Sequence, residues 1–214
     1  MFGYVEFPLI CRTKNPTMVS SLDPLPRIAL FASGNGSNVQ RIAEYYSGKG
    51  LLEIAAIYCN KPEAYVLERA IHLNIPSVLF SRNTFIHTTE ILDDLRARKV
   101  DWIILAGFLW LIPEYLIEAY PNKIVNIHPA LLPNYGGKGM YGHKVHEAVI
   151  NAGDPVSGIT IHFVNQEYDA GQVIFQALCN VSVDDTPDTL AQKIHGLEYE
   201  HFPVVIGRLV LAKD

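Results

Sequence analysis

The sequence predicts an α/β fold with a doubly wound, mostly parallel (Rossmann-like) sheet, a C-terminal antiparallel strand pair and a long final helix. Over residues 27–128, short apolar runs alternate with stretches of helical periodicity, which is typical of successive βαβ units. Residues 102–106 are uniformly apolar, as expected of a strand covered on both faces. After residue 128 the alternation stops, and two strand-like runs joined by a short connection indicate the antiparallel pair.

Each strand of the parallel part is expected to be an apolar run that ends at a polar or glycine-containing segment. These runs lie at residues 28–32, 54–59, 77–80, 102–106 and 124–127. The helices between them are expected at residues 39–46, 64–73, 84–99 and 113–119. Asn74 and Pro76 end the second helix because proline cannot continue a helix, and Thr84 can cap the start of the third.

The last third of the chain follows a different pattern. Residues 129–142 are rich in glycine and proline and are expected to form a loop, followed by a helix at residues 143–151. The antiparallel strands are expected at residues 158–164 and 172–181. Thr186 and Pro187 supply the cap and first-position proline of the final helix. That helix is expected to run to about residue 201, where Pro203 bends or restarts it.

A single domain is expected over residues 27–214, preceded by an N-terminal extension over residues 1–26 that is expected to be poorly ordered. The extension contains four prolines, which disfavour regular structure. Basic residues follow its short apolar run rather than precede it, so it lacks the order of a secretory signal. Glu6 and Asp23 argue against a transit peptide, because transit peptides are poor in acidic residues.

Composition excludes several classes of protein. The 17 Lys and Arg residues are outnumbered by 22 Asp and Glu residues, a formal net charge of −5, which argues against nucleic-acid binding because phosphates need clustered cations. The most apolar stretch, residues 103–112, is shorter than the roughly 20 residues of a membrane span. Three widely spaced cysteines match neither a zinc site nor a disulfide framework, so we expect no metal and a cytoplasmic location.

A glycine-rich loop, Ser-Gly-Asn-Gly-Ser-Asn at residues 33–38, lies between the first strand and the first helix. A helix start offers free N–H groups that suit an anion, and this position in a parallel sheet is where ligands bind. The loop lacks the third glycine of a dinucleotide-binding motif, since Val39 occupies that place, and it lacks the Gly-Lys of a P-loop. It therefore predicts a site for a single phosphate, and the alternative is a tight turn with Ser37 as the helix cap.

A second candidate site lies at the end of the fifth strand. Asn126 and His128 are two residues apart, so they project from the same side of the strand at its carboxyl end. An amide that donates to an oxyanion and an imidazole that moves protons suit an attack on an acyl carbonyl. The alternative is a capping Asn and a His satisfied by the backbone. No Gly-x-Ser-x-Gly elbow is present, which favours direct transfer over a covalent acyl-enzyme.

A third candidate, Asp169, lies in the connection between the two antiparallel strands. A carboxylate facing His128 would raise the pKa of that histidine and keep it protonated. The alternative is a turn residue, because Asp is common in turns that contain Gly.

Together these segments resemble the phosphoribosylglycinamide formyltransferase family, folate-dependent enzymes of purine biosynthesis. The resemblance runs from about Arg27 to the C-terminus. Besides the glycine loop, its motifs are Leu-Ala-Gly-Phe-Leu at residues 105–109, Asn-Ile-His-Pro-Ala-Leu-Leu-Pro at 126–133, Gly-Ile-Thr-Ile-His-Phe-Val at 158–164 and Asp-Ala-Gly-Gln-Val-Ile-Phe-Gln at 169–176. The second motif with the later Asp-x-Gly is typical of formyltransferases that use 10-formyltetrahydrofolate, and the Gly-Ser-Asn loop separates this family from relatives that act on methionyl-tRNA or nucleotide sugars.

The resemblance implies a reaction and a set of roles. The formyl group of 10-formyltetrahydrofolate, a cosubstrate, would pass directly to the glycyl amine of phosphoribosylglycinamide (GAR) without a metal. The implied catalytic residues are Asn126, His128 and Asp169. The residues implied to bind the ribonucleotide are Gly36, Ser37 and Asn38 at its phosphate, and Glu198. The residues implied to lie near the folate are Leu109, Trp110, Leu111, Ile112, Asn126 and Val164.

Two departures from the family pattern concern the folate side. Trp110 stands where members often have Arg, so stacking would replace a contact to the folate, and residues 135–142 form a longer loop than in short members. The partners implied are the two small molecules, with no nucleic acid and no membrane, and the protein would be a monomer or homodimer. Alternative functions are a 10-formyltetrahydrofolate hydrolase, a formyltransferase for a different amine, and a non-catalytic module that binds a nucleotide or sugar phosphate.

Overall fold

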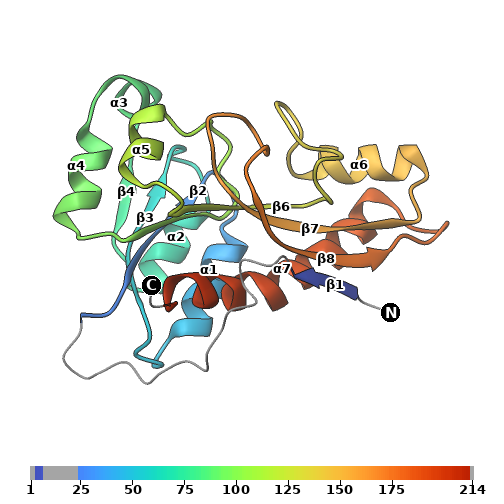
Figure 1. Ribbon diagram of the computed structural model, residues 1–214, viewed down its shortest axis with the longest axis horizontal. Helices are drawn as coiled ribbons and strands as arrows, with labels where there is room; N and C mark the ends of the chain where they lie inside the picture. The colour runs from blue at the N-terminus through green and yellow to red at the C-terminus, as the bar shows by residue number, and fades with distance from the viewer. Residues whose placement is uncertain (1–2, 7–23, 213–214) are drawn as a thin grey trace.

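The computed structural model describes residues 3–6 and 24–212 of the chain. Their strands form one eight-stranded mixed sheet with the order β1-β8-β7-β6-β5-β2-β3-β4 (Figure 1). The parallel part confirms the predicted doubly wound arrangement. Its strands are β2 (Arg27–Ala32), β3 (Glu53–Cys59), β4 (Ser77–Leu79), β5 (Trp102–Leu105) and β6 (Ile124–His128).

Strand β2 is the topological switch point of the sheet, where the order of the strands reverses. The chain adds β3 and β4 on one side of β2, then returns to add β5 and β6 on the other side. The segments that leave β2 and β5 therefore diverge, which opens a crevice at the carboxyl ends of these strands. Ser33 links its two walls, because its N–H donates to the Gly107 carbonyl at 3.0 Å and its hydroxyl accepts from the Leu109 N–H at 3.0 Å.

The antiparallel part also follows the prediction. Strands β7 (Val156–Phe163) and β8 (Val173–Asn180) pair antiparallel, and β7 pairs antiparallel with β6 as well. A short helix, α6 (His143–Ala152), precedes β7. Within the extension expected to be poorly ordered, Gly3–Glu6 forms β1 and pairs antiparallel with β8, and residues 1–2 and 7–23 lie outside the described residues.

The helices are α1 (Ser37–Tyr46), α2 (Val66–His72), α3 (Arg82–His87), α4 (Glu90–Ala97), α5 (Glu114–Ala119) and α7 (Pro187–Val210), besides α6. The single helix predicted at residues 84–99 was wrong, because two helices, α3 and α4, occupy this region. The Thr88 hydroxyl donates to the Thr84 carbonyl and accepts from the Glu90 N–H, so a threonine side chain takes over backbone bonds and ends α3.

The final helix was predicted to bend or restart at Pro203, but α7 continues through it to Val210. Proline removes the N–H that would bond to the carbonyl four residues earlier, which belongs to Tyr199. Arg41 replaces that donor, because its Nε donates to the Tyr199 carbonyl at 3.0 Å. Tyr46 donates its hydroxyl to the Pro203 carbonyl at 2.6 Å. Helix α1 therefore supports α7 at the point where α7 lacks an internal bond.

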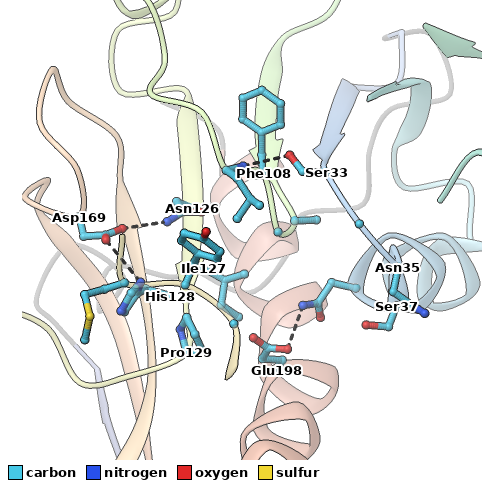
Figure 2. Close-up of a pocket in the computed structure, with 18 of the residues that line it drawn as sticks. Ser33, Asn35, Ser37, Phe108, Asn126, Ile127, His128, Pro129, Asp169 and Glu198 are labelled. Carbon is cyan, nitrogen blue, oxygen red and sulfur yellow. Dashed lines mark hydrogen bonds and ion pairs between the residues drawn. The ribbon is translucent and has the colours of Figure 1, made fainter. Parts of the chain in front are cut away.

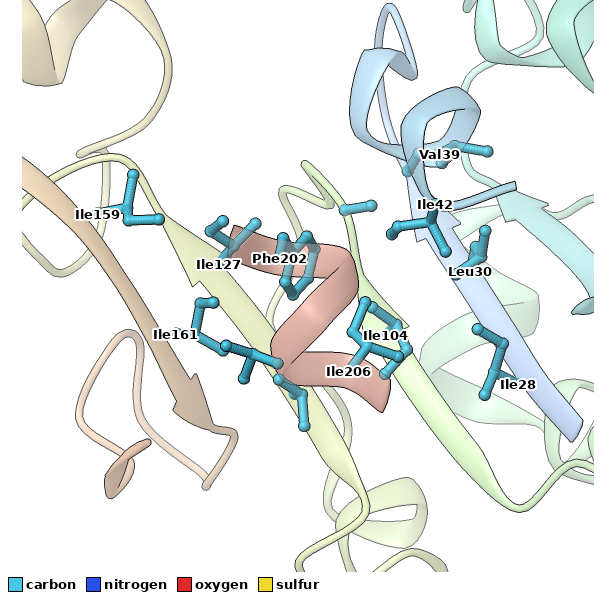
Figure 3. Close-up of a cluster of buried hydrophobic side chains, with 14 of the residues drawn as sticks. Ile28, Leu30, Val39, Ile42, Ile104, Ile127, Ile159, Ile161, Phe202 and Ile206 are labelled. Carbon is cyan, nitrogen blue, oxygen red and sulfur yellow. The ribbon is translucent and has the colours of Figure 1, made fainter. Parts of the chain in front are cut away.

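The sheet is buried on both faces, as its apolar strands predict. Ile28 and Leu30 of β2 face a core that includes α1 and α7, whereas Ala29 and Phe31 face a second core with α4 and α5. Phe202 and Ile206 of α7 lie among the sheet side chains of the first core (Figure 3). Among residues 3–6 and 24–212, no helix combines the length and apolarity that a membrane span requires.

We expect Tyr46→Phe to lower the free energy of unfolding by about 1–2 kcal/mol, because it removes the buried hydrogen bond from the Tyr46 hydroxyl to the Pro203 carbonyl. Urea unfolding followed by circular dichroism measures this loss. Tyr45→Phe is the matched control, since the neighbouring Tyr45 ring is only partly buried and its hydroxyl has no hydrogen bond in the described structure. Equal unfolding midpoints for the Tyr46→Phe protein and the wild type would contradict the support of α7 by α1.

Candidate active site

A cavity of about 640 Å³ lies at the carboxyl ends of the central strands (Figure 2). Its walls are the segments that follow β2, β3, β5 and β6, the glycine-rich loop before α6, the connection between β7 and β8, and part of α7. Seven of the predicted site residues line it, from four separate parts of the chain: Gly36, Ser37, Asn38, Asn126, His128, Asp169 and Glu198. Leu109 lines it as well.

Helix α2 holds the glycine loop from behind. The Gly34 carbonyl accepts from the Val66 N–H at 3.1 Å, and the Arg69 guanidinium donates to the backbone and side-chain oxygens of Asn35 at 2.8 and 2.7 Å. Gly36 has φ +76°, and a Cβ there would lie 2.4 Å from a Val66 methyl carbon. Only glycine fits this close approach in the left-handed conformation.

The start of α1 is free to bind an anion. Its N-cap is Gly36, no side chain of the described residues caps it, and no acidic residue lies in its first turn. The alternative in which Ser37 caps the helix was wrong, because Ser37 is the first helical residue. The unpaired N–H groups and the positive end of the helix dipole face the cavity, which suits a phosphate.

Glu198 on α7 meets the first turn of α1 inside the cavity. One of its oxygens, Oε2, accepts from Asn38 Nδ2 at 3.0 Å and contacts His195 Nδ1 at 3.0 Å. The Glu198 hydrogen bond raises the pKa of His195. Glu198 is buried, so these two partners offset the cost of burying its carboxylate. Asn38 and Glu198, 160 residues apart, thus form one polar unit.

The predicted trio converges around the Asp169 carboxylate (Figure 2). Asn126 Nδ2 lies 3.4 Å from Asp169 Oδ1, and His128 Nδ1 lies 3.5 Å from Asp169 Oδ2. The other imidazole nitrogen, His128 Nε2, contacts the Tyr135 carbonyl at 2.8 Å. Since a carbonyl only accepts, Nε2 carries a proton and Nδ1 faces the carboxylate.

The loop before α6 completes this arrangement. Besides the Tyr135 carbonyl, it supplies the Gly137 N–H, which donates to Asp169 Oδ2 at 2.9 Å. A Cβ at Gly136 would lie 2.6 Å from Leu132 Cδ2 and 3.3 Å from Asp169 Cβ, so a side chain there would push against Asp169. The longer loop noted in the sequence therefore contacts two members of the trio directly.

His162 was missed by sequence reasoning. It lies on β7 directly opposite Asn126 on β6, and it is 2% exposed. Its Nδ1 donates to the Phe163 carbonyl at 2.8 Å, which leaves Nε2 to accept from Asn126 Nδ2 at 3.0 Å. This contact orients the Asn126 amide with its nitrogen toward Asp169 and the cavity. The signal in the sequence was the histidine of the motif at residues 158–164, but only the strand register shows its partner.

The Asp169 charge acts to raise the pKa of His128, as expected, but it is not the largest influence on that pKa. Burial lowers the pKa of His128, and the Asp169 charge, which acts in the opposite direction, does not outweigh burial. Burial would raise the pKa of Asp169, but the polar groups around its oxygens hold that pKa below its usual range. The pKa values of both groups therefore lie below their usual ranges.

The residues expected near the folate separate into three groups. Leu109 lines the main cavity, whereas Trp110, Leu111 and Ile112 line a second cavity of about 410 Å³. Tyr168 lines both cavities and so connects them. Val164 is not among the lining residues of either, and it packs against the second core.

Two further cavity residues were not singled out from the sequence. His146 on α6 is buried with Val145 and Val149, and its Nδ1 has no hydrogen-bond partner among residues 3–6 and 24–212. The sequence pattern that could have indicated it is a histidine on the apolar face of the helix predicted at residues 143–151. Lys61 follows β3 directly, at the same edge as the glycine loop. In the described part of the chain, no group of three or more His, Cys, Asp or Glu side chains is placed to hold a metal ion.

Comparison with known proteins places the chain in a family. Residues 26–206 match the family model described as "Formyl transferase". The chain belongs to the formyl transferase family. It is 41% identical to the chloroplastic phosphoribosylglycinamide formyltransferase of Arabidopsis thaliana, over 86% of this chain and 65% of that protein. It thus spans less than two thirds of this plant relative.

Bacterial members of the formyl transferase family match over more of their length. The phosphoribosylglycinamide formyltransferase of Bacillus subtilis is 38% identical over 87% of this chain and 95% of its own length. The crystal structure of glycinamide ribonucleotide transformylase 1 from Geobacillus kaustophilus is 36% identical, with a TM-score of 0.79 over 87% of this chain and 100% of that one. The fold described above is therefore shared with this solved structure.

Replacing Asp169 by Asn is expected to lower the pKa of His128 further, because the charge that opposes the effect of burial is removed. Nuclear magnetic resonance titration of the His128 Cε1 proton measures the change. Glu198→Gln is the control, since the Glu198 charge contributes less to that pKa and its loss should lower it less. An unchanged or raised pKa in the Asp169→Asn protein would contradict the pairing.

A second expectation concerns stability and pH. Burial, reinforced by the charge of His195, lowers the pKa of His146 to about 4. The unfolded chain, with a histidine pKa of about 6.5, binds more protons than the folded protein between these values, so stability falls as pH falls from about 6.5 to 4. His146 accounts for about 3 kcal/mol of that fall. Between pH 7 and pH 4.5, the free energy of unfolding of His146→Leu, measured in urea, should fall by less than that of the wild type. Equal falls in the two proteins would show that His146 is not the cause.

Proposed function

We propose that the protein transfers the formyl group of 10-formyltetrahydrofolate directly to the glycyl amine of GAR, giving formyl-GAR. The observation that carries the proposal is that one cavity contains both an uncapped helix start and the group Asn126, His128 and Asp169. The helix start suits a phosphate, and the three side chains suit a carbonyl under attack. Family membership and the names of the relatives support the same reaction.

The phosphate of GAR would dock on the N–H groups of Gly36, Ser37 and Asn38, and Glu198 would bind the ribose. With the phosphate held at α1, the glycyl amine extends across the cavity toward the end of β6. Holding both reactants in this orientation supplies several kcal/mol of the barrier reduction, because the two molecules no longer need to meet by diffusion. The formyl donor would approach from the side of Leu109, where the two cavities meet at Tyr168.

The uncharged amine attacks the formyl carbon, a new C–N bond forms, and negative charge develops on the formyl oxygen. Asn126 donates to that oxygen the N–H that faces Asp169 in the ligand-free site, because its other N–H is held by His162. The developing charge, like that of Asp169, raises the pKa of His128, so the neutral imidazole takes up the proton that the amine loses. The bond from the formyl carbon to N10 then breaks, and the proton passes to N10.

The roles of Asn126 and His128 predict the kinetics of their variants. Asn126→Ala and His128→Ala should each lower kcat by about 10²–10³, the cost of removing one oxyanion donor or one proton-transfer group. The KM values should change little, because these contacts form in the transition state. Steady-state assays that vary each substrate separately measure both constants. Turnover near that of the wild type in either variant would overturn the assigned role.

A two-substrate assay separates the alternative functions. If loss of the formyl group from 10-formyltetrahydrofolate requires GAR and yields formyl-GAR, the transferase is supported. Loss in water alone would identify a hydrolase, and loss only with another amine would change the acceptor. Absence of any loss would favour a non-catalytic sugar-phosphate module. A cytoplasmic location, no binding of nucleic acid or membrane, and a monomer or homodimer remain predictions from the sequence.

A further inference from the structure

We propose that Lys61 binds the phosphate of the substrate and supplies the full positive charge that the glycine loop lacks. This inference rests on the proposed function, since that function puts a phosphate at the start of α1. It adds a charged side chain to a site that the sequence assigned to Gly36, Ser37 and Asn38, which carry no charge.

The strand register places Lys61 beside the glycine loop. Strands β2 and β3 are parallel neighbours, and Ala32 at the end of β2 pairs with Cys59 at the end of β3. The segments that leave these two strands therefore start side by side at the same edge of the sheet. Ser33 to Asn38 on one segment and Lys61 on the other line the same cavity.

The backbone of Lys61 is held in place while its side chain is not. The Lys61 carbonyl accepts from the Cys59 thiol and from the Ala64 N–H, both at 3.2 Å. These two bonds make a tight turn between β3 and α2 and fix the direction in which the residue leaves the strand. Lys61 is partly buried, but no ion pair or hydrogen bond of its ammonium group occurs among the described residues.

The other charged groups around the cavity are already in use or lie elsewhere. Arg69 is committed to Asn35 through two hydrogen bonds. Glu198 Oε2 is bonded to Asn38 and His195, and the Asp169 oxygens face Asn126, Gly137 and His128. Lys138 also lines the cavity, but it belongs to the exposed part of the loop before α6. In the part of the chain that the structure describes, Lys61 is thus the cation beside the glycine loop that is left without a partner.

The charge balance explains why a lysine is needed. A phosphate monoester carries about −1.5 to −2 charges at pH 7, whereas a helix start is equivalent to roughly +0.5. The whole protein has a formal net charge of −5, so its surface does not attract an anion. A compact, rotatable ammonium group is well suited to a phosphate that also accepts from several N–H groups, because it needs no fixed geometry.

The test compares Lys61→Met with Lys61→Arg and with Lys123→Met. Lys123 is exposed and directly precedes β6, at the opposite end of that strand from the cavity, so its loss removes the same charge from a distant place. For Lys61→Met we expect the KM for GAR to rise about 10-fold or more, with kcat and the KM for 10-formyltetrahydrofolate within about 2-fold of the wild type. Lys61→Arg should recover most of the affinity.

A substrate without the phosphate distinguishes binding from a structural effect. Glycinamide riboside should be used equally poorly by the wild type and by Lys61→Met, because neither can gain from a phosphate contact. If Lys61→Met impairs the riboside as much as GAR, or leaves the KM for GAR unchanged, the proposal is overturned.

Binding of inorganic phosphate tests the inference without turnover. We expect phosphate to shift the amide resonances of Gly36, Ser37 and Asn38 in the wild type, and to bind about 10-fold more weakly to Lys61→Met. If the wild type shows this binding but no formyl transfer, the proposed function fails and the role of Lys61 stands. Equal phosphate affinity in the two proteins, or no phosphate binding to either, would overturn the role of Lys61.

Discussion

The return of the chain to the second side of β2 is the constraint on which the site depends. Because β3 lies on one side of β2 and β5 on the other, the segments at their carboxyl ends separate and leave room for ligands. Ser33 bonds across the base of this opening to Gly107 and Leu109, which fixes its width. The glycine loop, the end of β6 and α7 all border the same opening, so groups from distant parts of the chain act on one volume.

Burial and hydrogen bonding, more than net charge, set the electrostatics of the cavity. The carboxylates of Asp169, which is partly buried, and Glu198, which is buried, are each satisfied by protein donors, and this lets two carboxylates coexist with an anion-binding helix start. At His128 burial outweighs the adjacent carboxylate, so the pKa of the imidazole lies below its usual value. The same desolvation strengthens the response of His128 to charge that develops during a reaction.

Local patterns predicted the elements well where one local signal decided the structure. The ends of the apolar runs lie close to the ends of the observed strands, and Thr186 with Pro187 marks the start of α7. The errors came where a side chain elsewhere replaced a backbone bond. Thr88 ended α3 within an otherwise helical pattern, and Arg41 allowed α7 to continue through Pro203. Helical periodicity predicts neither replacement. Thr88 bonds through its side chain, which the spacing of apolar residues does not show, and the Arg41 bond joins residues 158 positions apart.

The sequence by itself determined the fold class, the glycine loop and the pairing of Asn126 with His128 on one side of a strand, because these follow from neighbours and a period of two. It also contained the motifs that indicate the family. Only the tertiary structure brought Asp169 to these two residues, placed His162 behind Asn126 and joined Asn38 to Glu198. The reason is physical: such contacts depend on strand register and on how helices pack on the sheet, and both result from burial of the whole core rather than from any local pattern.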